Sequence, residues 1–95
     1  MVEERVVRRV RISGTVQGVG FRAWISETAS AVGVDGWVRN RRDGTVEAVF
    51  AGPRSRVEEM IRRCHRGPAL ARVARVEVTD EPDDPGEGFF LLPTA

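Results

Sequence analysis

The sequence predicts an α+β fold, with two helices on one face of an antiparallel sheet of four strands and a possible fifth strand at an edge. Apolar residues alternate with a period of two in several short segments, and they recur with a helical period in two others. These segments follow one another in the order β-α-β-β-α-β. The 95 residues have the length of one domain, residues 1–95, with a single hydrophobic core.

The first strand and the first helix are predicted on either side of a glycine-rich loop. In residues 5–13 the apolar positions of equal parity are Val6, Val10 and Ile12. The loop that follows contains Gly14, Gly18 and Gly20. In residues 22–32 one helical face consists of Trp24, Ile25, Thr28, Ala29 and Val32. Gly33 then stands where a glycine commonly ends a helix, so we expect the helix to stop there.

A hairpin and a second helix are predicted next. Residues 34–40 and 45–50 have strand patterns, and the sequence Arg-Arg-Asp-Gly between them predicts a hairpin turn. One face of the second of these strands consists of Val46, Ala48 and Phe50. The second helix is expected to begin near Pro53, a favourable first-turn residue, and to end at Gly67-Pro68. Its apolar stripe consists of Val57, Met60, Ile61 and Cys64.

The remaining segments complete the sheet. Residues 71–79 are predicted to form a strand, residues 80–88 an acidic loop and residues 89–92 a short last strand. Two crossover units with both helices on one face correspond to the split βαβ, or ferredoxin-like, plan. In this plan the first two strands run in the same direction and finish at the same end of the sheet. We therefore expect Arg22, which follows the first strand, to lie near Asn40, which ends the second.

The composition excludes several classes of protein. The chain is 41% hydrophobic and 31% charged, as in globular rather than disordered proteins, and no apolar run is long enough to span a membrane. The charged start argues against a signal peptide and the single Cys64 agrees with a reducing compartment, so we expect a cytoplasmic protein. The net charge of +1 gives no indication of a nucleic-acid partner. No set of His, Cys and carboxylate residues has metal-ligand spacing.

The glycine loop is the strongest candidate for a binding site. Gly18 and Gly20 would let the backbone N–H groups of residues 16–21 point inward, and such a nest binds anions. The following helix adds its unpaired N–H groups, and the guanidinium of Arg22 matches two phosphate oxygens. Together these features predict a site for a phosphate-sized dianion. From the residues alone, an ordinary strand-to-helix turn with a solvated Arg22 is the alternative.

Two other kinds of site fit the sequence poorly. The loop matches the dinucleotide-binding pattern G-x-G-x-x-A, but the chain is too short for the sheet that such a site requires, and the hairpin contradicts it. Cys64 and His65 are adjacent on a helix, so their side chains diverge and cannot act together as nucleophile and base. We expect Cys64 in the core and His65 on the surface.

Two segments, GTVQGVGFRAW and GWVRNRRDGTVEAVF, resemble the signatures of the acylphosphatase family. The resemblance covers nearly all of the chain after Arg5 and implies a ferredoxin-like fold. It also implies hydrolysis of acyl phosphates to a carboxylate and inorganic phosphate, without a metal or cofactor. By this resemblance, Arg22 binds the substrate phosphate and Asn40 positions the attacking water. The residues implied to form the phosphate cradle with their backbone are Val16, Gln17, Gly18, Val19, Gly20 and Phe21.

The resemblance further implies a small monomer with an acyl phosphate substrate and with inorganic phosphate as product and inhibitor. Two alternatives are a non-catalytic module that binds phosphate or carbamoyl phosphate, and an interaction domain of ferredoxin-like shape. The absence of zinc-finger cysteines argues against the first, and the near-neutral charge and few sheet aromatics argue against the second. The residues leave open the role of the Gln17 side chain, the identity of the acyl group, and whether Arg41 and Arg42 face the site or solvent.

Overall fold

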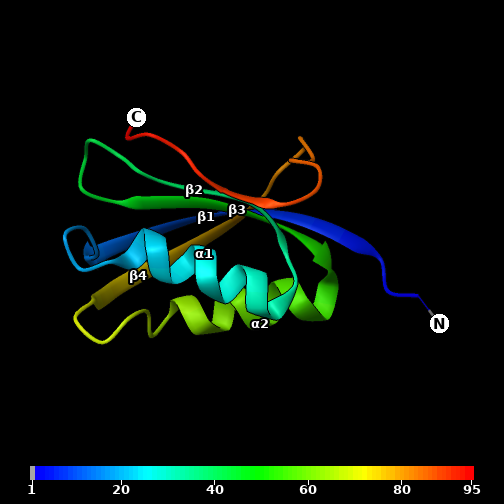
Figure 1. Cartoon of the computed structure of the whole chain (residues 1–95), viewed down its shortest axis with the longest axis horizontal. Helices are drawn as coiled ribbons and strands as arrows, with labels where there is room; N and C mark the ends of the chain where they lie inside the picture. The colour runs from blue at the N-terminus through cyan, green and yellow to red at the C-terminus, as the bar shows by residue number, and fades with distance from the viewer. Residues whose placement is uncertain (1) are drawn as a thin grey trace.

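The computed structural model describes residues 2–95, and its sheet contains five strands in the order β4-β1-β3-β2-β5 (Figure 1). The strands are β1 (Arg5–Thr15), β2 (Asp35–Asn40), β3 (Val46–Pro53), β4 (Arg72–Asp80) and β5 (Phe89–Leu91). The helices are α1 (Phe21–Val32) and α2 (Arg54–Cys64), and both lie on the same face of the sheet. The predicted order of elements, including the short last strand, is confirmed.

The sheet is mixed rather than wholly antiparallel. β1 pairs antiparallel with β3 and with β4, and β2 pairs antiparallel with β3, as the ferredoxin-like plan predicts. The added strand β5 lies at an edge and pairs parallel with β2. Residues 81–88 carry the chain from the end of β4 to the far edge of the sheet, so that β5 enters beside the start of β2 and runs in the same direction.

The first strand is longer than the sequence predicts. Gly14 and Thr15 pair with Val73 and Arg72 of β4, after a shift of register behind Ser13. Sequence periodicity cannot reveal this extension, because it depends on the partner strand. Gly14 therefore belongs to β1, and the loop between β1 and α1 consists of residues 16–20.

The core lies between the sheet and the two helices. Its buried side chains include those of Val10, Ile12, Ile25, Ala29, Val38, Val46, Ala48, Phe50, Val57, Met60 and Cys64. Burial of a large aliphatic or aromatic side chain stabilises a fold by about 1.5–3 kcal/mol, so these contacts fix the helices on the sheet. Cys64 is a core residue, as predicted, and burial raises the pKa of its thiol to about 12. His65 is exposed, also as predicted.

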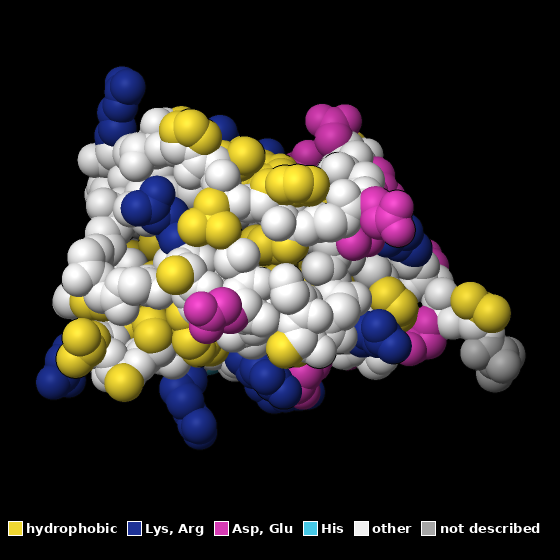
Figure 2. Space-filling view, in the orientation of Figure 1, with side chains coloured by type: hydrophobic (Ala, Val, Ile, Leu, Met, Phe, Trp, Pro, Cys, Tyr) yellow, Lys and Arg dark blue, Asp and Glu magenta, His cyan; other side chains and the backbone are white. Residues whose placement is uncertain are grey.

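The strand directions bring two connections to one end of the molecule. β1 and β2 run in the same direction because each is antiparallel to β3, which lies between them. The loop 16–20 and the turn between β2 and β3 therefore lie at the same end of the sheet, on the left in Figure 1. The acidic segment 81–88 lies at the other end, where acidic side chains gather in Figure 2. Among residues 2–95, no helix has both the length and the apolar character needed to cross a membrane.

Candidate active site

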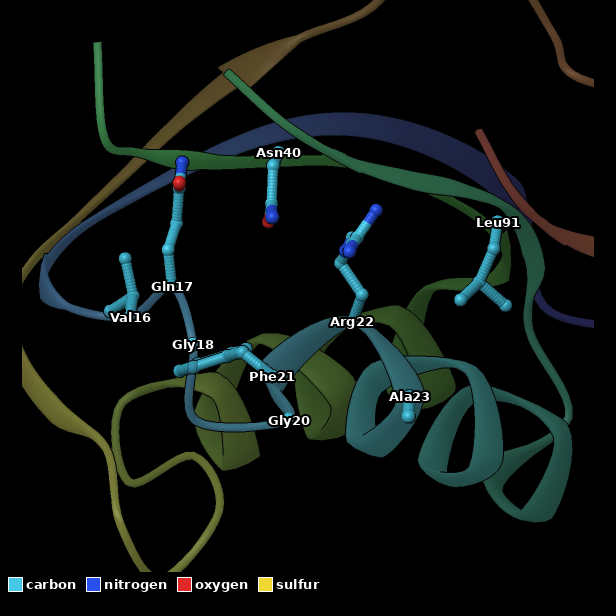
Figure 3. Close-up of a pocket in the computed structure, with 9 residues that line it drawn as sticks. All are labelled: Val16, Gln17, Gly18, Gly20, Phe21, Arg22, Ala23, Asn40 and Leu91. Atoms are coloured by element: carbon cyan, nitrogen blue, oxygen red, sulfur yellow. The ribbon is translucent and has the colours of Figure 1, made fainter. Parts of the chain in front are cut away.

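A pocket of about 280 Å³ lies between the start of α1 and the end of β2. It is lined by Val16, Gln17, Gly18, Gly20, Phe21, Arg22, Ala23, Asn40 and Leu91. Figure 3 shows the side chains of Arg22 and Asn40 pointing into the same space, one from the helix and the other from the strand. The tertiary structure thus brings together the two residues that the sequence singled out as catalytic candidates.

The first turn of α1 determines where Arg22 points. Phe21 is 2% exposed and fixes the start of the helix in the core, with an edge-to-face contact to Trp24. Successive helix residues are rotated by about 100°. Arg22 therefore lies on a different side of the helix from Phe21, half-buried and directed into the pocket. Within residues 2–95, no carboxylate forms an ion pair with its guanidinium.

The loop before α1 presents hydrogen-bond donors that the fold does not use. Gly18 and Gly20 have φ angles of 73° and 77°, in the left-handed region that favours glycine. A Cβ on either residue would meet no atom within 4 Å, so the backbone conformation, and not crowding, requires glycine. In the described residues 2–95, none of the backbone N–H groups of residues 17–23 donates a hydrogen bond. With the positive end of the helix dipole, these donors favour an anion in the pocket.

Asn40 is held by backbone pairing on both sides. It pairs with Val46 in β3, and its carbonyl accepts a hydrogen bond from the N–H of Ala95 at 3.0 Å. Its side chain has the same parity as that of Val38, which is buried against the helices. Asn40 therefore lies on the helix-covered face of β2, but at the end of the strand, beyond the helices. Its amide reaches the pocket from this position.

The side chain of Gln17, whose role the sequence left open, links the loop to the hairpin. Its Nε2 donates hydrogen bonds to the carbonyl oxygens of Arg41 at 2.7 Å and Thr45 at 2.9 Å. The predicted cradle residue Val19 is not among the lining residues, and its half-buried side chain packs against the core, but its backbone N–H is one of the unused donors among residues 2–95. The other predicted cradle residues all line the pocket.

The sequence did not indicate two lining residues, Ala23 and Leu91. Ala23 follows Arg22 on α1 and carries no chemical signal of its own. Leu91 belongs to β5, and it reaches the pocket only because β5 lies beside β2 with Leu91 opposite Val38. No local pattern in the sequence determines this pairing.

The two arginines after Asn40 do not line the pocket. Arg41 has the opposite parity to Asn40, so it belongs to the other face of the sheet, where its Nη1 lies 3.5 Å from Oε1 of Glu47. Arg42 is exposed. The interpretation that Arg41 and Arg42 face the site and add positive charge to it is therefore not supported. Arg22 is the cationic side chain among the pocket residues.

Glu47 organises the sheet face that carries no helix. Its side chain is 1% exposed, and Oε1 accepts a hydrogen bond from Nε of Arg39 at 2.8 Å. Arg9 also pairs with it, and Arg11 lies within 3.6 Å. Burial alone would raise the pKa of the Glu47 carboxyl, but the hydrogen bonds and charges of Arg39 and Arg9 hold the pKa below its ordinary value. Among residues 2–95, no group of three or more His, Cys, Asp or Glu side chains could hold a metal ion.

The similarity to known proteins agrees with this geometry. The acylphosphatase family model matches residues 8–91. An acylphosphatase from Rhizorhabdus wittichii is 55% identical over 91 residues, covering 96% of this chain and 92% of the relative, and one from Rhodopseudomonas palustris is 57% identical over 95 residues, covering 94% and 96%. The structure of an acylphosphatase from Coxiella burnetii has a TM-score of 0.88 and 30% sequence identity, covering 93% of each chain. The chain therefore belongs to the acylphosphatase family.

Proposed function

We propose that the pocket between α1 and β2 is where this member of the acylphosphatase family hydrolyses acyl phosphates, with Arg22 and Asn40 as its catalytic residues. The substrate is a small molecule that carries a carboxyl-phosphate mixed anhydride. The observation that carries the proposal is the convergence of three groups in one pocket. These are a guanidinium without a carboxylate partner among residues 2–95, the amide of Asn40, and the unused N–H groups of the loop.

In this proposal the loop and Arg22 hold the phosphoryl group. The N–H groups of residues 16–21 and the guanidinium donate hydrogen bonds to its equatorial oxygens, where charge spreads in the transition state. These donors are fixed before the substrate binds, because the sheet and the first turn of α1 hold both ends of the loop. Their electrostatic stabilisation therefore requires little reorganisation during the reaction.

Asn40 supplies orientation rather than basicity. Its amide oxygen accepts a hydrogen bond from the attacking water, and its NH₂ group is left to hold a second partner. The water oxygen attacks phosphorus as the bond from phosphorus to the acyl oxygen breaks, and a phosphate oxygen of the substrate takes the water proton. The products are a carboxylate and inorganic phosphate. A carboxylate leaves readily without protonation, so the reaction does not need a strong general acid.

Hydrolysis of benzoyl phosphate in the presence of a chelator tests the proposal. The wild type should be active, and the activity should persist with chelator. Asn40→Ala should lower kcat by about 100-fold or more while leaving the inhibition constant of inorganic phosphate nearly unchanged, because Asn40 aligns water and does not hold phosphate. An inactive wild type would refute the function. A loss of activity with chelator would refute the metal-free mechanism, and normal turnover by Asn40→Ala would refute the role of Asn40.

The proposal also covers inhibition by the product, the oligomeric state and the compartment of the enzyme. Inorganic phosphate should inhibit competitively, because it resembles the part of the substrate that the loop holds. We propose a monomeric protein of one domain, residues 1–95, that works in the cytoplasm and has no nucleic-acid partner. The buried, unpaired Cys64 supports a reducing compartment. Phe50 is buried under the helices and the ring of Trp37 is covered by Arg39 and Arg9, so neither ring offers a free face for a base.

A further inference from the structure

We propose that Gln17 is a positioning residue that fixes the phosphate loop at its working distance from Asn40. This inference rests on the proposed function and adds a role for a side chain that the reaction does not consume. It follows from the contacts of Gln17, from the rigidity of the hairpin that it contacts, and from the small number of other attachments of the loop.

The amide of Gln17 completes the hydrogen bonding of two carbonyl groups. The carbonyl of Arg41 accepts from the N–H of Gly44 at 3.1 Å and from Nε2 of Gln17 at 2.7 Å. The carbonyl of Thr45 accepts from the N–H of Arg41 at 2.8 Å and from the same Nε2 at 2.9 Å. Both protons of the side-chain NH₂ are thereby used, and each carbonyl accepts two hydrogen bonds, which is its full capacity.

The turn that receives these bonds is rigid without Gln17. Its two backbone hydrogen bonds close it, and Oδ1 of Asp43 also accepts bonds from the N–H of Thr45 at 2.9 Å and from its hydroxyl at 2.7 Å. Asn40 directly precedes this turn and is paired within the sheet. The hairpin therefore holds Asn40 in a fixed position, and the hydrogen bonds of Gln17 connect the loop to this hairpin.

The loop has few other attachments. The buried side chain of Val16 holds one end and that of Phe21 holds the other. Between them the half-buried side chain of Val19 packs against the core, whereas Gly18 and Gly20 have no side chains that could anchor the backbone. Figure 3 shows the Gln17 side chain extending from this loop to the end of the hairpin strands. The two hydrogen bonds of Gln17 therefore set the separation between the bound phosphoryl group and the water that Asn40 orients.

Loss of this link should separate alignment from binding. In Gln17→Ala the loop N–H groups and Arg22 can still hold phosphate, but the phosphoryl group shifts relative to Asn40. Small misplacements of reacting groups are costly, so we expect kcat for benzoyl phosphate to fall about tenfold or more, and the inhibition constant of inorganic phosphate to change less than about threefold. Asp43→Ala is the matched control, because it weakens the same turn and keeps both bonds of Gln17. Its kcat should stay within about twofold of the wild type.

Gln17→Glu provides a readout that a loss of folding would not produce. The carboxylate has nearly the same shape as the amide but no proton to donate, and it faces two carbonyl oxygens. Protonation restores one donor. The kcat of Gln17→Glu, relative to the wild type at the same pH, should therefore rise as the pH is lowered through the pKa of the new carboxyl. Gln17→Ala should show no such rise.

These measurements separate this inference from the function on which it rests. An inactive wild type would refute the proposed function itself. With an active wild type, a Gln17→Ala variant with unchanged kcat would overturn the positioning role. Equal losses of kcat and phosphate affinity, or a Gln17→Glu variant without acid recovery, would also overturn it, because both would assign Gln17 to phosphate binding or to folding alone.

Discussion

The arginines on the two faces of the sheet differ in whether they form ion pairs. On the face without helices, the side chains of four arginines lie within 4 Å of the buried carboxylate of Glu47: Arg9, Arg11, Arg39 and Arg41. At the end of the helix-covered face, Arg22 lines a pocket without an ion-pair partner among the described residues 2–95. The arginines of the first group all have carboxylate partners within the protein, since Arg9 also pairs with Glu81 and Arg11 with Asp43. Arg22 has no such partner among residues 2–95, and in the proposed function its charge serves the ligand.

Location in the fold, and not residue type, separates the ion-paired arginines from the unpaired Arg22 in the pocket. All fifteen basic residues of this chain are arginines, so composition alone cannot distinguish them. On the open face, the arginines also cover Trp37, with the guanidinium carbons of Arg39 and Arg9 at 4.8 and 5.8 Å from its ring. The carboxylates of this network, those of Glu47, Glu81 and Asp43, do not line the pocket, where a negative charge would repel a phosphate.

The largest expected effect comes from removing the unpaired arginine. Arg22→Ala should reduce kcat/KM for benzoyl phosphate by about 100-fold or more, which corresponds to about 3 kcal/mol of transition-state stabilisation. Inhibition by inorganic phosphate should weaken at the same time, because Arg22 contacts the phosphate in both cases. Steady-state kinetics with and without phosphate measure both effects. Arg42→Ala is the matched control, since Arg42 is exposed and does not line the pocket, and it should stay within about twofold of the wild type.

The next effect concerns stability and comes from the opposite face. Glu47→Gln leaves several arginines around a neutral side chain, and the free energy of unfolding should fall by about 2 kcal/mol at pH 7. The pKa of Glu47 is lowered in the folded protein, so its stabilising contribution is present above its ordinary value of 4.5 and is lost as the pH falls below it. Urea denaturation at pH 7 and at lower pH should therefore show a difference between wild type and variant that shrinks in acid. A variant as stable as the wild type at pH 7 would contradict this account of the open face.

The smallest effect is expected from the acidic end of the molecule. A side-chain hydrogen bond from Arg5, and then the N–H of Gly86, lower the pKa of the exposed Asp84 from 3.8 to about 2. Because the folded-state pKa is lowered, Asp84 stabilises the fold above about pH 4, and this contribution is lost as the pH falls towards 2. Asp84→Asn should slightly lower the urea midpoint at pH 7 and should leave it unchanged near pH 2. A midpoint equal to that of the wild type at pH 7 would mean that this ion pair does not stabilise the protein.

Much of the fold was predictable because local pattern and chain connectivity agree. The parity of Val46, Ala48 and Phe50 correctly identified the helix-facing side of β3, which is buried on both faces. The predicted stripe of the second helix is buried at Val57, Met60 and Cys64 and half-buried at Ile61. The helix between β1 and β2 returns the chain to the other end of the sheet, so the two strands were expected to run in the same direction, and their common antiparallel pairing with β3 confirms it. From that direction alone, Arg22 and Asn40 were expected at one end of the sheet, and both line one pocket.

Other features depend on partners that are distant in the sequence. The parallel pairing of β5 with β2 brings Leu91 to the pocket. A strand of three residues is too short for its sequence to indicate at which edge of the sheet it pairs. The extension of β1 through Gly14 depends likewise on β4.

The sequence by itself determined the element order, the core faces and the two residues that meet in the pocket, because periodicity and strand direction are properties of the chain. Only the tertiary structure decided which polar side chains are already engaged. In the structure, Arg41 pairs with Glu47 on the opposite face, and the amide of Gln17 donates hydrogen bonds to the hairpin carbonyls of Arg41 and Thr45. Hydrogen bonds and ion pairs join residues whose separation in space is set by packing and register, and local sequence does not encode that separation.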